Sequence, residues 1–185
     1  FRKVHSIPRE KVPIDGFERP ALVIDPETKK FKLYGCGPWP EHGWSIIKWD
    51  DADDPRQFAP SSAKAVIVPP EKKGPRDFAV VGYKDPFIIH AQGQYHCYVI
   101  GVLKSVERTF HFASDDGETW EPVGSPYESL IDLAGWHDFF ARPASAVPVG
   151  IGYLLVYEGS NVNWHDPVYN ICTGLGFTFD LHHVI

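Results

Sequence analysis

The sequence lacks methionine, has only three cysteines, and nowhere runs 18 apolar residues together. The missing apolar run predicts no membrane-spanning helix. Basic residues are also fewer than acidic ones, with 18 Lys and Arg against 24 Asp and Glu. The resulting net charge of −6 argues against nucleic acid as the main partner. Cys36, Cys97 and Cys172 are odd in number and have no CxxC spacing. We expect them to be buried small apolar residues rather than a disulfide or a metal site.

The chain also lacks an initiating methionine at Phe1 and a charged-then-apolar signal segment, and it stops at Ile185 directly after a strand-like run. We therefore expect a fragment or a processed form, truncated on its C-terminal side. Its location stays open between secreted, periplasmic and cytoplasmic.

The composition is globular, with 43% hydrophobic residues, 14% aromatics, 16 Gly and 17 Pro. This much glycine and proline is typical of short strands and turns. No segment has a persuasive 3.6-residue apolar period, and a helical turn fits only Ser125 to Leu133. We therefore predict an all-β fold.

One pattern occurs three times: a polar residue and a proline, an apolar strand, a turn, and a strand that ends in an aromatic residue and a glycine. The copies begin at Arg19-Pro20, Asp85-Pro86 and Arg142-Pro143, so successive prolines are 66 and 57 residues apart. Such repeats indicate radial arrays of antiparallel sheets, because one hairpin cannot bury its apolar face alone. We predict a β-propeller of four-stranded antiparallel blades, about three of which are present.

The propeller would form a single, incomplete domain over residues 1–185, with blades at about 17–70, 80–130 and 139–185. The expected strands are residues 21–24, 31–35, 44–49, 63–68, 87–90, 95–100, 108–114, a segment re-entering at Trp120, 144–149, 153–158 and 169–177. The innermost strands would be 21–24, 87–90 and 144–147. Three blades do not close a ring, so missing blades or, less favoured, partner chains would complete it. Open blade edges would invite self-association.

The first strand of each blade lines the central channel of a propeller, so the residues at its start converge on one pocket. These residues are Glu18-Arg19, Lys84-Asp85 and Ala141-Arg142. Proline is tolerated at the start of a strand, so each pair could simply begin one. Three copies in register favour a funnel that holds a polar ligand.

Three motifs carry a resemblance to a known group. Residues 84–89 with residues 93–98 resemble the "DP…G-x-Y-x-x-Y" blade opening of the five-bladed β-propeller glycosidases, which are the arabinanase/xylosidase-like, invertase-like and mannoside-phosphorylase-like families. Residues 114–120 are similar to their "S-x-DG-x-x-W" hairpin, and residues 157–159 resemble the strand end that carries the acid glutamate in the first two families. The resemblance spans most of residues 17–180.

The resemblance implies that Asp85 orients the acid and stabilises the oxocarbenium-like centre, and that Glu158 is the general acid. Glycosidic cleavage needs two or more carboxylates at one sugar, one of them protonated. Glu158 ends an apolar strand, where partial burial would favour its protonated form; the alternative is a solvated strand-end residue. The families also place a catalytic aspartate in the first blade, where this chain has Glu18-Arg19-Pro20. Glu18 or Asp15 takes that role, the aspartate lies on a missing blade, or this chain uses another arrangement.

A second polar and aromatic cluster lies around the third repeat, at residues 136–138 and 161–166. Aromatic rings stack on sugars while polar groups bind hydroxyls, so we expect His137, Asp138, Trp164 and His165 to contact the sugar. The alternative is a polar hairpin loop with packing tryptophans. The nine histidines show no HxH or HExxH spacing, so we expect no metal site and no cofactor, while a central cation such as calcium, held by a single histidine, stays open.

The sequence thus predicts a glycoside hydrolase that acts on an oligo- or polysaccharide in a central funnel. Arg19, Lys84 and Arg142 would bind substrate there. One alternative is a glycoside phosphorylase that uses these three cations for phosphate, and another is a non-catalytic glycan-binding propeller. The sugar, the linkage, the base or nucleophile and the stereochemical outcome stay open.

Overall fold

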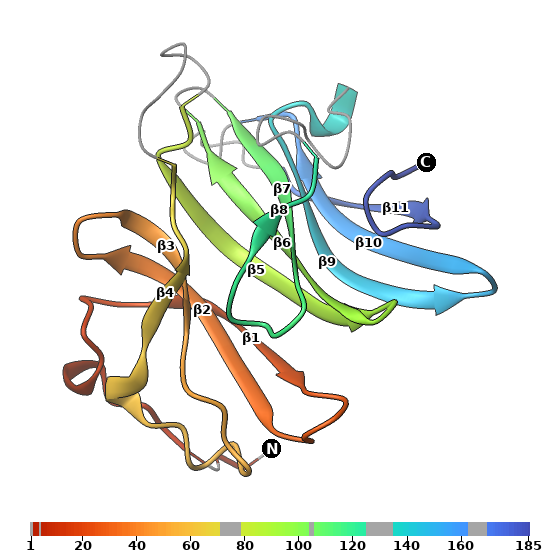
Figure 1. Ribbon diagram of the computed structural model, residues 1–185. Coiled ribbons are helices and arrows are strands. Elements are labelled where there is room, and N and C mark those ends of the chain that lie inside the picture. Colours follow the sequence, from red (N-terminus) through yellow and green to blue (C-terminus); the bar gives the residue numbers. More distant parts are fainter. Residues whose placement is uncertain (1, 4, 71–78, 104–105, 125–134, 163–169) are drawn as a thin grey trace.

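The computed structural model describes residues 2–3, 5–70, 79–103, 106–124, 135–162 and 170–185, which form three antiparallel sheets arranged side by side (Figure 1). The short helices in these ranges are single 3₁₀ turns: η1 (Arg9–Lys11), η2 (Pro60–Ser62) and η3 (Gly135–His137). No helix in the described ranges is long and apolar enough to cross a membrane. The all-β propeller fold predicted from the sequence is confirmed. The expected helical turn at residues 125–133 lies outside the described residues.

The first sheet is a four-stranded meander in the order β1-β2-β3-β4. Its strands are β1 (Glu18–Ile24), β2 (Phe31–Trp39), β3 (Gly43–Lys48) and β4 (Lys64–Ile67). Asp25 closes the first hairpin, because its carboxylate accepts hydrogen bonds from the backbone N–H groups of Glu27 and Thr28.

The second sheet repeats this meander with β5 (Gly82–Ala91), β6 (Gln94–Val102), β7 (Glu107–Ser114) and β8 (Glu121–Pro122). Gln92 and Gly93 join β5 to β6 with φ values of +53° and +84°, as a two-residue hairpin turn requires. The predicted hairpin at residues 114–120 also forms. The Asp116 carboxylate accepts from Ser114 Oγ and from two backbone N–H groups. Trp120 follows the turn and packs edge-on against Tyr34 of the first sheet.

The third sheet differs from the prediction, because it has three strands rather than four in the described residues. They are β9 (Phe140–Val149), β10 (Gly152–Ser160) and β11 (Cys172–Thr178). Beyond β11 the chain turns back, and Ile185 and Phe177 exchange two backbone hydrogen bonds of 2.9 Å. This return contact occupies the position beside β11 where a fourth strand would pair.

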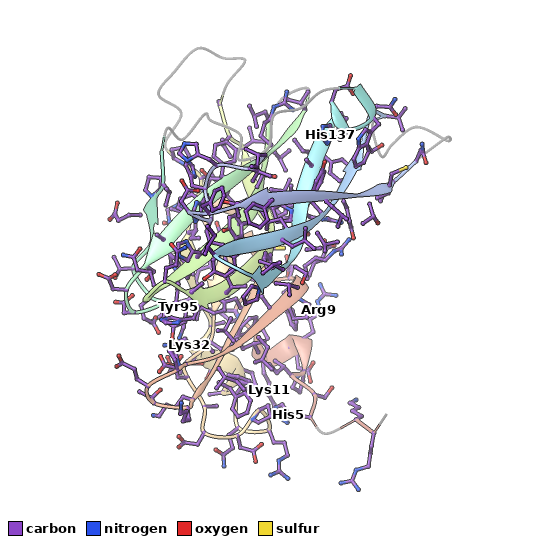
Figure 2. All side chains as sticks on the ribbon, turned by 90° about the vertical axis from the view of Figure 1, so that its right-hand side faces the viewer. His5, Arg9, Lys11, Lys32, Tyr95 and His137 are labelled. Atoms are coloured by element: carbon purple, nitrogen blue, oxygen red, sulfur yellow. The ribbon has the colours of Figure 1, made fainter. Side chains whose placement is uncertain are left out.

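The apolar core consists of three clusters of buried residues. The largest cluster lies between the first two sheets and includes Tyr34, Cys97 and Phe110. A smaller cluster, with Tyr98 and Tyr157, joins the second and third sheets. Lys32 and Tyr95 lie side by side at the junction of the first two sheets, with the ammonium 5.6 Å from the ring centroid (Figure 2).

The remaining core cluster covers the other face of the first sheet. The N-terminal arm (residues 7–17) lies there, and its Val12 and Ile14 are buried with Ile47, Trp49 and Phe58. The arm therefore covers this face of the first sheet.

The cysteine prediction is partly wrong. Cys36 and Cys97 are fully buried in the core, but Cys172 is exposed at the start of β11. Cys172 lies on β11, the edge strand of the third sheet, and its thiol is in contact with solvent.

Candidate functional site

The starts of the three inner strands meet around one cavity of about 330 Å³. Its walls include the dipeptides Arg19-Pro20 of β1, Asp85-Pro86 of β5 and Arg142-Pro143 of β9, and Glu158 of β10. The remaining lining residues are mostly apolar: Ala21, Leu22, Phe87, Ile88 and Ala144. The repeated polar-residue–proline pairs therefore come together in space.

Each inner strand carries a register shift next to its proline, as β-bulges do where a side chain must be redirected. Arg19 and Asp85 adopt φ values of +49° and +53°, a left-handed conformation that is uncommon for residues other than glycine. In β9 the shift falls one residue later, between Pro143 and Ser145, so Arg142 keeps a regular position opposite Glu158. The bulges therefore set which way the side chains at each strand start point.

Arg142 joins the two carboxylates of the cavity. Its Nη1 donates to Asp85 Oδ2 and its Nη2 donates to Glu158 Oε2. The side chains of Arg142, Asp85 and Glu158 are 13%, 11% and 32% exposed, so Glu158 is the most open of the three. Burial opposes the charged guanidinium, but the hydrogen bond to Glu158 and the charge of Asp85 outweigh it and raise the pKa of Arg142 above its usual value.

Arg19 completes the charged group more loosely. Its Nε lies 3.8 Å from Asp85 Oδ1, and its side chain is largely exposed. Asp85 thus faces a cation on each side, whereas Arg19 keeps most of its guanidinium free for a ligand.

A buried thiol supports the backbone behind this group. Cys36 Sγ donates to the carbonyl of Glu18 at 3.5 Å and accepts from the Asp85 backbone N–H at 3.3 Å. Burial raises the pKa of Cys36 to about 12, so the sulfur keeps the proton that it donates. The sequence prediction treated Cys36 only as packing; its two hydrogen bonds form only where β1, β2 and β5 meet, so no signal in the sequence marks this role.

Three of the six residues predicted at the strand starts lie outside the cavity lining: Glu18, Lys84 and Ala141. The Glu18 side chain is exposed, and Lys84 Nζ lies 3.3 Å from Glu107 Oε1. The register shift between Lys84 and Phe87 redirects the chain at this point, so Lys84 and Asp85 meet different partners. Lys84 therefore serves an ion pair of the second sheet in this structure.

The second predicted cluster is separate from the cavity. His137 stacks on Trp136, with ring centroids 4.6 Å apart, and Trp136 in turn stacks on Tyr157 at 5.7 Å. Tyr157 is buried on the face of β10 opposite to that of its neighbour Glu158, so this aromatic stack does not face the cavity. Asp138 is exposed, and its charge partly opposes the burial that lowers the pKa of Arg108. Trp164 and His165 lie outside the described residues.

No group of three or more His, Cys, Asp and Glu side chains is arranged to hold a metal ion in the described part of the chain. The charged groups that line the central cavity among the described residues are two carboxylates and two guanidinium groups. Such a set can bind hydroxyls, orient a sugar and transfer a proton.

Comparisons with known proteins find no matching family model and no matching curated protein. Among solved structures, the chain is similar to a glycosyl hydrolase from Bacteroides ovatus (TM-score 0.64, 17% identity), covering 96% of this chain and 52% of that one. It is also similar to a family 117 glycoside hydrolase from the marine bacterium Zobellia galactanivorans (TM-score 0.61, 14% identity), covering 91% of this chain and 54% of that one.

A third similar structure comes from the GH130 family, described as mannoside phosphorylases containing glycoside hydrolases that target β-1,2 mannosidic linkages in Candida mannan. Its TM-score is 0.62 at 17% identity, covering 96% of this chain and 52% of that one. The fold is therefore that of the β-propeller glycosidases, as the resemblance implied. This chain spans about half the length of these structures.

Proposed function

We propose that this chain supplies the central catalytic pocket of a glycoside hydrolase, which cleaves a glycosidic bond of an oligo- or polysaccharide. Asp85 orients the acid and stabilises the positive charge that develops on the sugar. Glu158, the more open carboxylate, donates the proton to the leaving oxygen. Arg19 and Arg142 bind sugar hydroxyls.

The proposal depends on one observation: the Asp85 and Glu158 carboxylates bind the two terminal nitrogens of one guanidinium. Two carboxylate oxygens that accept hydrogen bonds of normal length from the two terminal nitrogens of one guanidinium lie within about 8 Å of each other. Carboxyl pairs about 5–10 Å apart are the pairs that cleave glycosidic bonds. A proton on Glu158 would break its ion pair with Arg142, so this pair opens when substrate binds.

Glycan binding without cleavage is the second candidate function, and a specific observation favours it. Asp85 and Glu158 are the only carboxylates among the described residues that line the cavity, and Arg142 pairs with both. Phosphorolysis has less support, because Arg142 and Lys84 already pair with carboxylates and leave Arg19 as the open cation.

The test is turnover by the intact protein on a panel of aryl glycosides and of arabino-, xylo- and manno-oligosaccharides. We expect hydrolysis of at least one substrate, with a loss of about 10²–10⁴-fold for Glu158→Gln on oligosaccharides. The matched control is Glu121→Gln, on the exposed strand β8, which should keep the parent rate. Saccharide binding without hydrolysis by the unaltered protein would leave the binding candidate in place.

A further inference from the structure

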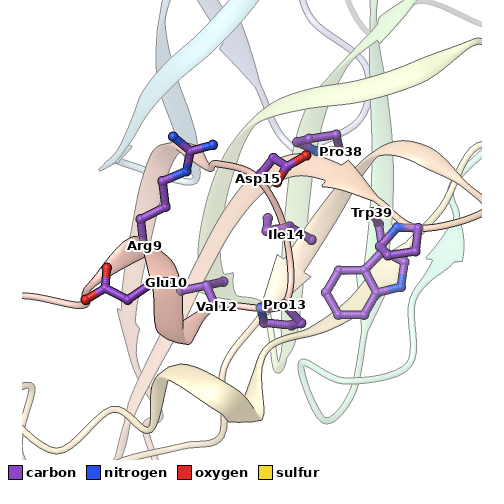
Figure 3. A pocket seen from close by; sticks show the side chains of 9 residues that line it. Arg9, Glu10, Val12, Pro13, Ile14, Asp15, Pro38 and Trp39 are labelled. Atoms are coloured by element: carbon purple, nitrogen blue, oxygen red, sulfur yellow. The ribbon is translucent and has the colours of Figure 1, made fainter.

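A second cavity, larger than the central one, lies between the N-terminal arm and the end of β2. It measures about 570 Å³, and its lining includes Arg9, Glu10, Asp15, Pro38 and Trp39. Figure 3 shows Arg9 and Glu10 on the side opposite Trp39. The size is within the range of pockets that hold small organic ligands.

The walls of this cavity are fixed by the core beneath them. Val12 and Ile14 line the cavity and also belong to the core cluster beneath it, where they are 7% and 8% exposed. Gly37 brings β2 against the arm, because a Cβ at this glycine would stand 2.4 Å from the carbonyl oxygen of Gly16. The pocket is therefore preformed, so little ordering is needed when a ligand binds.

The polar groups of the cavity are available to a ligand. Arg9, Glu10 and Asp15 are exposed, and within the described ranges none of their side chains has a hydrogen bond or an ion pair. Trp39 is half-buried: it packs against the core cluster of the N-terminal arm and also lines the cavity. An aromatic face beside free carboxylates and a guanidinium suits a sugar, whose C–H face stacks on the ring while its hydroxyls bind the charged groups.

The outer cavity and the proposed catalytic pocket are lined by neighbouring parts of the chain. Glu18 pairs with Cys36, so the end of β2 at Trp39 extends past the start of β1. Asp15, in the outer cavity, precedes Arg19, in the central one, by four residues, which even a fully extended chain stretches over no more than about 14 Å. A short oligosaccharide spans this separation.

We propose that the outer cavity is a saccharide-binding subsite that holds a distal unit of the oligosaccharide whose scissile bond lies in the central cavity. This inference rests on the proposed function and adds to it a preference for substrates longer than a disaccharide. Trp39 supplies the stacking surface, and Arg9 and Asp15 bind hydroxyls.

Isothermal titration calorimetry on the intact Glu158→Gln protein tests the subsite without turnover. The probes are di- and hexasaccharides of the arabino-, xylo- and manno-series. We expect Trp39→Ala, added to this background, to weaken hexasaccharide binding by about tenfold and to leave disaccharide binding unchanged. The double variant Arg9→Ala/Asp15→Ala changes only exposed side chains and should act in the same direction. The control is Lys11→Ala, on the same 3₁₀ turn but outside the lining.

Equal effects on both chain lengths, or no effect of either variant, would overturn the subsite. Failure of the proposed function gives a different result: no hydrolysis by the unaltered protein, with length-dependent binding that still requires Trp39. In that case the outer cavity stands as a glycan-binding site.

Discussion

Lowering the pH should destabilise this protein through a buried stack of histidines. His111 on β7 stacks between His96 and His182, with ring centroids 5.2 and 5.3 Å away, and Tyr98 packs against it at 4.7 Å. Burial lowers the pKa of His111 to about 3, helped by the neighbouring histidines and only partly opposed by Asp180. His111 therefore stays neutral in the folded protein at pH values where an unfolded histidine is charged.

The size and sign of the effect follow from the two pKa values. Between the ordinary value of about 6.5 and the folded value of about 3, the unfolded chain binds one more proton than the folded chain at His111. The stability contributed by neutral His111 is complete above about pH 6.5 and is lost as the pH falls towards 3, at up to about 1.4 kcal/mol per unit. A fall to pH 5 should cost about 2 kcal/mol, and burial of His96 should steepen this loss.

Urea unfolding at several pH values between about 7.5 and 5, followed by tryptophan fluorescence, measures this loss. In His111→Gln the free energy of unfolding should fall less steeply with pH than in the parent, whatever its value at neutral pH. His42→Gln, in an exposed turn, should keep the parent slope. The same slope in His111→Gln as in the parent would refute the reasoning.

Two further predictions concern the junction of the first two sheets. Lys48→Met should lower the free energy of unfolding by about 3 kcal/mol in urea titration, because the buried ammonium lies 2.5 Å from carboxylate oxygens of both Asp51 and Glu118; an unchanged midpoint would contradict this. Gly117→Ala should cost about 1–3 kcal/mol in the same assay, since Gly117 has a φ of +72° and a Cβ there would stand 2.7 Å from Tyr34 Oη. Parent-like stability of the alanine variant would show that the turn tolerates a side chain.

The strand starts could be predicted because proline is tolerated in a β-strand only at its first residues, on an edge strand or at a bulge. Pro20, Pro86 and Pro143 all lie near the starts of inner strands, beside bulges, where a missing N–H breaks no regular ladder. The hairpin at residues 114–120 was predictable for the same kind of reason, since its turn is closed by hydrogen bonds between residues at most three apart.

Features that depend on contacts between distant segments could not be predicted. The hydrogen bonds of Cys36 to Glu18 and Asp85 exist only when β1, β2 and β5 meet. The sequence also could not show that Lys84 and Asp85 point to different partners, because the bulge that separates them is a property of strand pairing.

The leaving-group dependence of Glu158→Gln tests the central claim most directly. A general acid matters most when the leaving group is a poor one, such as a sugar hydroxyl, and matters little for an activated aryl group. We therefore expect Glu158→Gln in the intact protein to lose far more turnover on oligosaccharides than on activated aryl glycosides, whereas Asp85→Asn should lose turnover on both. Circular dichroism confirms that both variants fold. Equal turnover by the parent and both variants on the two substrate types would contradict the claim that these carboxylates cleave the bond.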